Sequence, residues 1–164
     1  NKYACLFDWD NGGVWIQMTR NTVKEGEISE QIFSHKCFVE HGYMVSNPIG
    51  TADYDLIVDV KEKIYRVQVK SSQRGNGNCM ISKGSNGQKG SKKYPYPEKS
   101  IDFFAIHDVV PDQWYIIPRS STGDAKQIRL SYKSVGKYSR YKDNWEFKTE
   151  CEFKWIKLWI YFQH

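Results

Sequence analysis

The sequence predicts an α/β or α+β domain, because a helical pattern, a β-hairpin and two further strand patterns follow one another along the chain. A helical pattern covers residues 27–41. A β-hairpin follows it, with strands at residues 53–59 and 64–70. Two apolar segments, residues 101–107 and 114–117, then have the length and composition of buried strands. A helix, a hairpin and further strands in this order are typical of a sheet packed against helices.

Length and composition fit one globular domain with a modest positive charge. The chain has 164 residues, of which 40% are hydrophobic and 26% charged, and its formal net charge is +5. A positive excess suits an anionic partner such as nucleic acid. We expect no membrane association and a cytoplasmic location, because no segment is long and apolar enough to span a bilayer and no signal-peptide pattern is present. The cysteines lack zinc-binding spacing and suit a reducing compartment; they are Cys5, Cys37, Cys79 and Cys151.

The predicted helix has an apolar face and a defined end. Ile28, Ile32 and Val39 fall on one face at helical spacing, so we expect this face to be buried. Gly42 stands where a glycine commonly ends a helix. Residues 43–45 then read as a short strand.

The hairpin is the strongest local signal in the chain. Side chains of a strand alternate between two faces, so the valines on either side of Gln68 point to the core, while Gln68 and Lys70 share the opposite face. If the turn contains an even number of residues, Asp55 lies directly opposite Gln68, and Asp53 lies opposite Lys70. A slip of one residue would turn Asp55 to the wrong face. We expect Asp53 and Asp59 to have structural roles.

This register would assemble a site for a hard cation. The Asp55 carboxylate, the Gln68 amide oxygen and the Val69 backbone carbonyl are the oxygen ligands that Mg²⁺ prefers, and Mn²⁺ accepts them too. Lys70 would position or deprotonate an attacking water and stabilise charge on a phosphate. Glu30, on the preceding helix, would complete the ligand shell through water. Asp55, Gln68, Lys70 and Glu30 are therefore the candidate catalytic residues.

Residues 73–97 form a glycine-rich segment without acidic residues. Such a segment is expected to be poorly ordered. It is either a solvated linker or a basic loop that follows a DNA groove through phosphate contacts. No Gly-Lys-Ser/Thr sequence occurs in it, which excludes a P-loop. The candidate DNA-binding residues are Arg74, Lys83, Lys89, Lys92 and Lys93.

The two ends of the chain are expected to lie outside the core domain. Residues 1–25 read as an N-terminal arm, and residues 1–17 are interpreted either as a short ordered arm or as a segment upstream of a natural start at Met18. Residues 149–164 read as a C-terminal extension. Its apolar part, residues 155–162, is expected to pack on the core or on a partner subunit.

Several motifs resemble those of a known family. The motifs are Gly26-Glu27-Ile28-Ser29-Glu30, Tyr54-Asp55-Leu56-Ile57-Val58-Asp59, Gln68-Val69-Lys70, Asp102-Phe103-Phe104-Ala105, Trp114-Tyr115-Ile116-Ile117-Pro118 and Tyr141-Lys142-Asp143-Asn144-Trp145. Over residues 26–148 they resemble the PD-(D/E)XK nuclease superfamily, and within it the branch of group I intron-encoded homing endonucleases with a Gln-Val-Lys signature. Tyr54 stands where the superfamily pattern has proline, and Gln68 stands where it has a second acidic ligand.

The resemblance implies a restriction-endonuclease-like core, with a mixed central β-sheet flanked by α-helices. It also implies metal-dependent hydrolysis of phosphodiester bonds in double-stranded DNA. Cutting both strands would need a homo-oligomer, a dimer or a tetramer, since one site cuts one strand. An intron-encoded member would act at the nucleoid or in an organelle. Junction-resolving nucleases share this core, so a structure-specific nuclease and a non-catalytic DNA-binding module stay open as alternatives.

Overall fold

A computed structural model describes residues 3–6, 14–17, 22–73, 77–84, 92–131, 136–153 and 155. The helical elements are α1 (Thr22–His35), a π-helical turn η1 (Lys36–Glu40) and two 3₁₀ turns, η2 (Arg119–Ser121) and η3 (Ser139–Tyr141). The strands are β1 (Tyr3–Leu6), β2 (Val14–Gln17), β3 (Met44–Ser46), β4 (Leu56–Val60), β5 (Lys63–Ser72), β6 (Asn78–Met80), β7 (Ser82–Lys83), β8 (Tyr94–Pro95), β9 (Phe103–Asp108), β10 (Gln113–Pro118) and β11 (Gln127–Arg129). None of the helices in these ranges is both long and apolar enough to cross a membrane.

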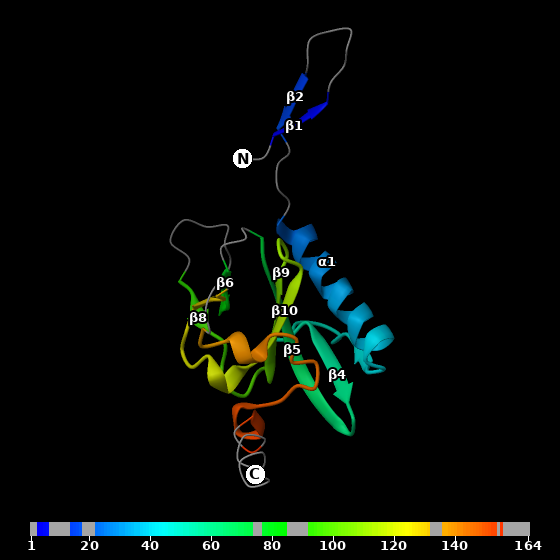
Figure 1. The fold of residues 1–164 in the computed structure, drawn as a ribbon, viewed down its shortest axis with the longest axis vertical. Coiled ribbons are helices and arrows are strands. Elements are labelled where there is room, and N and C mark those ends of the chain that lie inside the picture. Colours follow the sequence, from blue (N-terminus) through cyan, green and yellow to red (C-terminus); the bar gives the residue numbers. More distant parts are fainter. Residues whose placement is uncertain are drawn as a thin grey trace, which may run out of the picture.

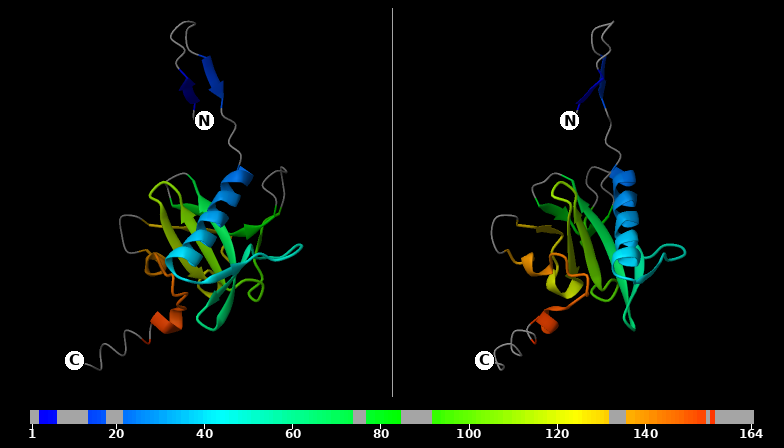
Figure 2. Two further views of the ribbon diagram at one scale, coloured as in Figure 1. Left: turned by 90° about the vertical axis from the view of Figure 1, so that its right-hand side faces the viewer. Right: turned by 45° about the vertical axis from the view of Figure 1, so that its right-hand side comes forward.

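A five-stranded mixed sheet forms the centre of the fold (Figure 1). Its strand order is β10-β9-β5-β4-β3. β5 and β9 pair in parallel, and the other neighbours pair antiparallel. α1 lies across one face of this sheet (Figure 2). The short strands β6, β7, β8 and β11 and the 3₁₀ turns cover the other face. The predicted mixed α+β architecture is therefore confirmed, although a helix covers only one of the two faces in the part of the chain that is described.

The hairpin has the predicted even turn. Lys61 and Glu62 form it, both with positive φ, and Val60 pairs with Lys63. Positive φ at both central positions is the geometry of the two-residue turns that match the twist of antiparallel strands. The pairing that follows includes Leu56 opposite Val67, which is the predicted register.

The buried face of the helix differs from the predicted one. Of the predicted face, Ile32 is partly buried against the core, but Ile28 and Val39 are 54% and 60% exposed. The buried residues are Ser29, Phe33 and Cys37. The buried residues are spaced by four, and the π-helical turn after His35 carries Val39 away from the sheet. The predicted end is correct, because Gly42 takes a positive φ of 69° and the chain enters β3 directly after it.

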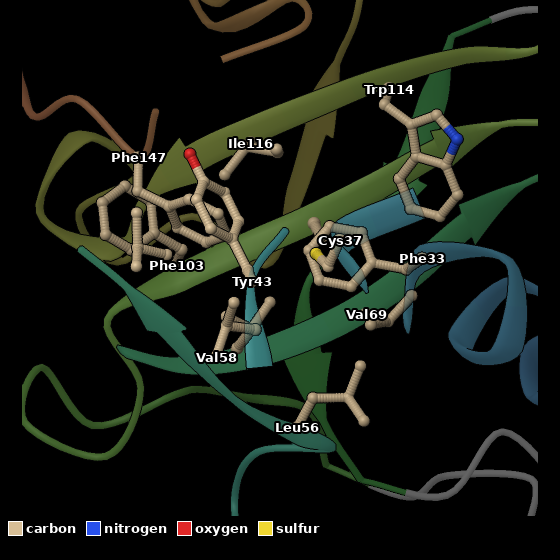
Figure 3. Close-up of a cluster of buried hydrophobic side chains, with 13 residues drawn as sticks. Phe33, Cys37, Tyr43, Leu56, Val58, Val69, Phe103, Trp114, Ile116 and Phe147 are labelled. Carbon is tan, nitrogen blue, oxygen red and sulfur yellow. The ribbon is translucent and has the colours of Figure 1, made fainter. Parts of the chain in front are cut away.

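Two apolar clusters lie on opposite faces of the sheet. The first lies between α1 and the sheet, and Phe33, Val69, Trp114 and Phe147 belong to it (Figure 3). The second lies on the other face and contains Phe104 with residues in or directly after β6, β8 and β11, such as Cys79, Ile81, Tyr96 and Ile128. The face that carries Gln68 is therefore also covered, and Gln68 is only 5% exposed.

The described parts of the glycine-rich segment, residues 77–84 and 92–97, contain strands that its composition does not predict. β6, β7 and β8 all fall within residues 73–97. β6 pairs with β11, and β7 pairs with β8 to form the stem of a small hairpin, which we call the β7–β8 stem. Cys79 and Ile81 are buried in the second cluster. Tertiary burial of a few apolar residues thus orders a segment that has no local preference for structure.

The chain ends carry local structure of their own. β1 and β2 pair as an antiparallel hairpin that lies away from the sheet in Figures 1 and 2. A helical turn begins at Glu150, and Thr149 caps it, because the Glu152 carboxylate accepts hydrogen bonds from the Thr149 N–H and hydroxyl. Trp155 is 71% exposed, so it does not pack on the core of its own chain, and its packing on a partner subunit stays a prediction. The rest of the predicted apolar tail lies outside the described residues.

Candidate active site

The Asp55 carboxylate is the centre of a small polar cluster at the start of β4. The Asp55 backbone N–H donates to the Val67 carbonyl at 2.9 Å, just beyond the last paired residue of β4, Leu56. The carboxylate oxygen Oδ2 accepts the Val69 N–H at 2.8 Å and the side-chain amide of Gln68. The structure therefore brings the side chains of Asp55 and Gln68 together as predicted, through these hydrogen bonds, although the regular strand pairing ends at Leu56.

The oxygens around Gln68 have the chemistry of a cation site. Its amide nitrogen Nε2 donates both to Asp55 Oδ2 and, at 3.3 Å, to the Val69 carbonyl. This nitrogen lies close to both oxygens, at a place where a bound cation could be coordinated by the same two oxygens. Turning the amide by half a turn brings its own oxygen to this place, since amide N and O are nearly isosteric. Among the described residues, no three of His, Cys, Asp and Glu gather as metal ligands, but one carboxylate, one amide and one carbonyl suit a hard divalent cation.

Burial raises the pKa of this carboxylate and of a second one nearby. Removal from water raises the pKa of Asp55, although the Lys70 charge and the hydrogen bonds from Val69 and Gln68 oppose the rise. Burial also raises the pKa of Glu30, and the nearby Asp55 carboxylate adds to the rise while Lys70 opposes it. Asp55, Glu30 and Lys70 thus lie close enough for the charge of one to shift the pKa of another. Ionisable groups with shifted pKa values are common at functional sites.

Glu30 reaches this cluster from α1. Its side chain is half-buried, and it lines an open groove between α1 and the strands β3 and β4, together with Glu27, Gln31, Asn47 and Leu56. Leu56 follows Asp55 directly, so the groove begins beside the carboxylate cluster.

Lys70 lies on the same strand as Gln68, two residues further along β5. Its Nζ lies 5.7 Å from the centre of the Tyr96 ring, within the range of a cation–π contact. Sequence reasoning did not single out Tyr96, which stands in the polar segment between two prolines. An aromatic residue in such a segment was the only available signal.

The predicted DNA-binding residues fall into three groups. Lys83, in β7, forms an ion pair with Asp53, so Asp53 does not lie opposite Lys70 as the register predicted. The strand pairing ends before Asp53, because β4 begins at Leu56. Lys92 is exposed and Lys93 half-buried, directly before β8 at the loop end of the β7–β8 stem. The remaining two, Arg74 and Lys89, lie outside the described residues.

A Ser–His–Asp arrangement elsewhere is structural. His107 Nδ1 lies 3.3 Å from the Ser29 hydroxyl, and its Nε2 lies 2.9 Å from Asp112. Ser29 is 2% exposed, so a substrate cannot reach it. The His107 ring stacks on Trp114 at 4.4 Å. This group attaches α1 to the sheet one residue before Glu30.

The comparisons with known proteins agree with the motifs. A family model described as PD-(D/E)XK endonuclease matches residues 20–148. Among solved structures, the fold is similar to that of a bacterial homing endonuclease, I-Ssp6803I, with a TM-score of 0.68 and 21% sequence identity, over 84% of this chain and 97% of that chain. No curated protein sequence matches the chain. Because the family model spans most of the chain, the resemblance indicated by the motifs is confirmed, and the chain belongs to the PD-(D/E)XK endonuclease family.

Proposed function

We propose that this endonuclease uses a divalent cation, Mg²⁺ or Mn²⁺, to hydrolyse phosphodiester bonds of double-stranded DNA at specific sites. The observation that supports this most directly is the convergence of the Asp55 carboxylate, the Gln68 amide and the Val69 carbonyl next to Lys70. Hard oxygen ligands beside a positive side chain suit a cation and a phosphate together.

Each residue of the cluster has a distinct task in this proposal. Asp55 supplies the negative charge that holds the cation, while Gln68 and Val69 supply neutral oxygens, and Glu30 completes the shell through water. When bound, the cation acts as a Lewis acid on the phosphate and lowers the pKa of a bound water. Lys70 donates hydrogen bonds to the phosphate and to the attacking water, and it stabilises the charge that develops as the P–O bond breaks.

The DNA substrate is supported by the charge beside the site. Lys83 lies in the β7–β8 stem, and Lys92 and Lys93 lie at its loop end, directly before β8. Lys83 also contacts the same Tyr96 ring as Lys70. Phosphate contacts from such residues set affinity and orientation, with a strong dependence on salt. A solved structure of similar fold is a homing endonuclease. This similarity favours a site-specific cut in double-stranded DNA as the reaction of the present chain.

An oligomer is part of the proposal, because one site cuts one strand. β3 is an edge strand of the sheet, and its Met44 is 64% exposed. Phe38 and Val39, on the adjacent η1, are each 60% exposed. Exposed apolar side chains of this size suit contact with a second copy. Such an enzyme would act in the cytoplasm, on DNA at the nucleoid, or in an organelle if an intron encodes it.

A plasmid-cleavage assay tests the proposal. Supercoiled plasmid is incubated with wild type, Asp55→Ala or Lys70→Ala in Mg²⁺, in Mn²⁺ and in EDTA. We expect nicked or linear products from wild type with either cation, none in EDTA, and a loss of at least about 100-fold in both variants. Equal activity in all three proteins would reject the site. Preferential cutting of a four-way junction over linear duplex would favour a junction-resolving nuclease, and DNA binding without cleavage by wild type would favour a binding module.

A further inference from the structure

The Tyr96 ring lies within cation–π distance of two lysines that come from different parts of the chain. Its centre is 5.7 Å from Lys70 Nζ and 6.0 Å from Lys83 Nζ. Lys70 belongs to the central sheet and Lys83 to the β7–β8 stem. We propose that Tyr96 is a positioning residue, which holds the Lys70 ammonium group for the reaction and links it to Lys83. The inference rests on the proposed function, in which Lys70 contacts the phosphate.

Tyr96 is itself held firmly in place. The residue is 6% exposed, and its ring packs edge-on against Phe104, with ring centres 5.5 Å apart. The Tyr96 carbonyl accepts hydrogen bonds from two nitrogens of the Arg119 guanidinium, of which Nε lies at 3.0 Å. Two hydrogen bonds from one edge of a planar guanidinium to this carbonyl leave little freedom to the backbone at Tyr96.

Arg119 is anchored at its other side as well. Its Nη1 donates to the Gly123 carbonyl at 2.6 Å and to the Thr122 hydroxyl at 3.2 Å. The residue is only 6% exposed. The ring of Tyr96 is therefore a rigid surface rather than an exposed side chain that adapts to the lysines.

A rigid ring matters because a lysine side chain is long and flexible. An ammonium group over an aromatic face is attracted to it electrostatically, and the attraction restricts the side chain to fewer positions. Correct placement of a catalytic group contributes directly to the rate. Lys83 is restrained from two sides, by the ring and by the ion pair with Asp53. If DNA binding moves the β7–β8 stem, the position of Lys70 would therefore change as well, because Lys70 and Lys83 contact the same ring.

The alternative role for Tyr96 is to fill the second apolar cluster. The two roles predict different effects when the electron density of the ring is lowered without a change of shape. Only a positioning role, which depends on attraction between the ring and the ammonium group, predicts a lower cleavage rate. Phenylalanine keeps both the volume and the aromatic face, leucine keeps an apolar side chain without the face, and fluorinated phenylalanines keep the shape but weaken the attraction for a cation.

The experiment compares wild type with Tyr96→Phe, Tyr96→Leu, fluorinated phenylalanines at position 96, Lys70→Met and the double variant Tyr96→Leu/Lys70→Met. Tyr94→Leu, two residues earlier, in β8, and at a 57% exposed position, is the matched control. Single-turnover cleavage of plasmid in Mg²⁺ gives the rate, and binding of the same DNA in Ca²⁺ gives the affinity. Thermal melting checks that each variant folds.

We expect Tyr96→Phe and Tyr94→Leu to cleave like wild type. Tyr96→Leu should lose about 5- to 30-fold in rate, with DNA affinity changed by less than about 3-fold, and added fluorines should lower the rate stepwise. Tyr96→Leu should cause no further loss in the Lys70→Met background. Full activity of Tyr96→Leu, additive losses in the double variant, or no effect of fluorination would each overturn the inference. If Tyr96→Leu does not fold, the fluorinated series decides.

A second measurement does not depend on cleavage. In NMR spectra of the metal-free protein, the side-chain signals of Lys70 should be shifted by the aromatic ring in wild type and in Tyr96→Phe. In Tyr96→Leu they should move to the positions of an unstructured lysine. Lys70→Met assigns the signals. If wild type cuts no DNA the proposed function fails, whereas Lys70 signals that do not change in Tyr96→Leu overturn the positioning role alone.

Discussion

Asp55 and Val69 are joined by a hydrogen bond of 2.8 Å, from the backbone N–H of Val69 to the carboxylate of Asp55. This contact ties the residue before β4 to the middle of β5. It brings the carboxylate beside the carbonyl of Val69 and the amide of Gln68, which together form the proposed cation site. The Asp55 carboxylate is also partly buried, and removing its charge from water lowers the stability of the folded protein.

The cost leads to the prediction that Asp55→Asn stabilises the metal-free protein. Burial raises the pKa of Asp55 in the folded state. A carboxyl with a raised pKa stabilises the fold below its ordinary pKa, and this contribution is lost as the pH rises through the raised value. Asparagine stays neutral and keeps an oxygen that accepts the Val69 N–H. In EDTA, we expect Asp55→Asn to melt a few degrees above wild type at pH 7 and at the same temperature in acid. A lower melting temperature at pH 7 would contradict the argument.

Gln68→Glu should strengthen cation binding and weaken the metal-free protein. A second carboxylate next to Asp55 adds charge to the site and, without a cation, places two like charges together in a buried position. We expect a loss of about 1–3 kcal/mol in the free energy of unfolding in EDTA. Titration with Mn²⁺ should then raise the melting temperature of Gln68→Glu more than that of wild type. Gln68→Ala serves as the control and should show a smaller Mn²⁺ effect than wild type. An equal response in all three would place the cation elsewhere.

The pair formed by Arg66 and Asp102 should determine part of the acid sensitivity. Asp102 accepts the Arg66 backbone N–H at 2.8 Å and two guanidinium N–H groups at 2.9 and 3.0 Å. Burial alone would raise the pKa of Asp102, but these hydrogen bonds and the Arg66 charge outweigh it, so the pKa lies below its usual value. The stabilisation is therefore present above the ordinary aspartate pKa and is lost as the pH falls through the lowered value.

Asp102→Asn should remove this dependence. We expect a loss of about 1–2 kcal/mol at neutral pH, since the partial exposure of both side chains weakens the ion pair, and a flatter decline of stability in acid. Urea unfolding between pH 7 and pH 3 measures both effects. Asp124→Asn, at an exposed position, is the matched control. A parallel decline in Asp102→Asn and wild type would assign the acid sensitivity to other carboxyls.

The turn of the hairpin should tolerate a stabilising change. Lys61 and Glu62 have φ values of 46° and 74°, which side chains other than Gly and Asn rarely adopt. Replacing them by Asn and Gly should raise the free energy of unfolding by about 0.5–1 kcal/mol. Cleavage should not change, because the register that places Asp55 opposite Gln68 stays the same. Alanine at both positions removes the same charges without relieving the backbone and should not stabilise. A loss of cleavage in the Asn-Gly variant would show that the turn contributes more than register.

The hairpin could be predicted because its information is local. Alternation of polar and apolar residues along β5 specifies which side chains share a face, and a two-residue turn specifies the register. Together they place Asp55 opposite Gln68 without reference to the rest of the molecule. The helix was predicted to exist for a similar reason, but its buried face was not. Ile28 and Val39 are more apolar than Ser29, yet contacts with Phe33, Trp114 and the π-helical turn decide which side faces the sheet.

The sequence by itself determined the family, the mixed sheet and the carboxylate–amide pair, because strand alternation and short motifs act over a few residues. Only the tertiary structure decided that residues of the glycine-rich segment pair as the β7–β8 stem, that Asp53 pairs with Lys83, and that Tyr96 lies near both lysines. These contacts join residues far apart in the chain. They form because burial of the second apolar cluster stabilises them, and no local pattern in the sequence records that burial.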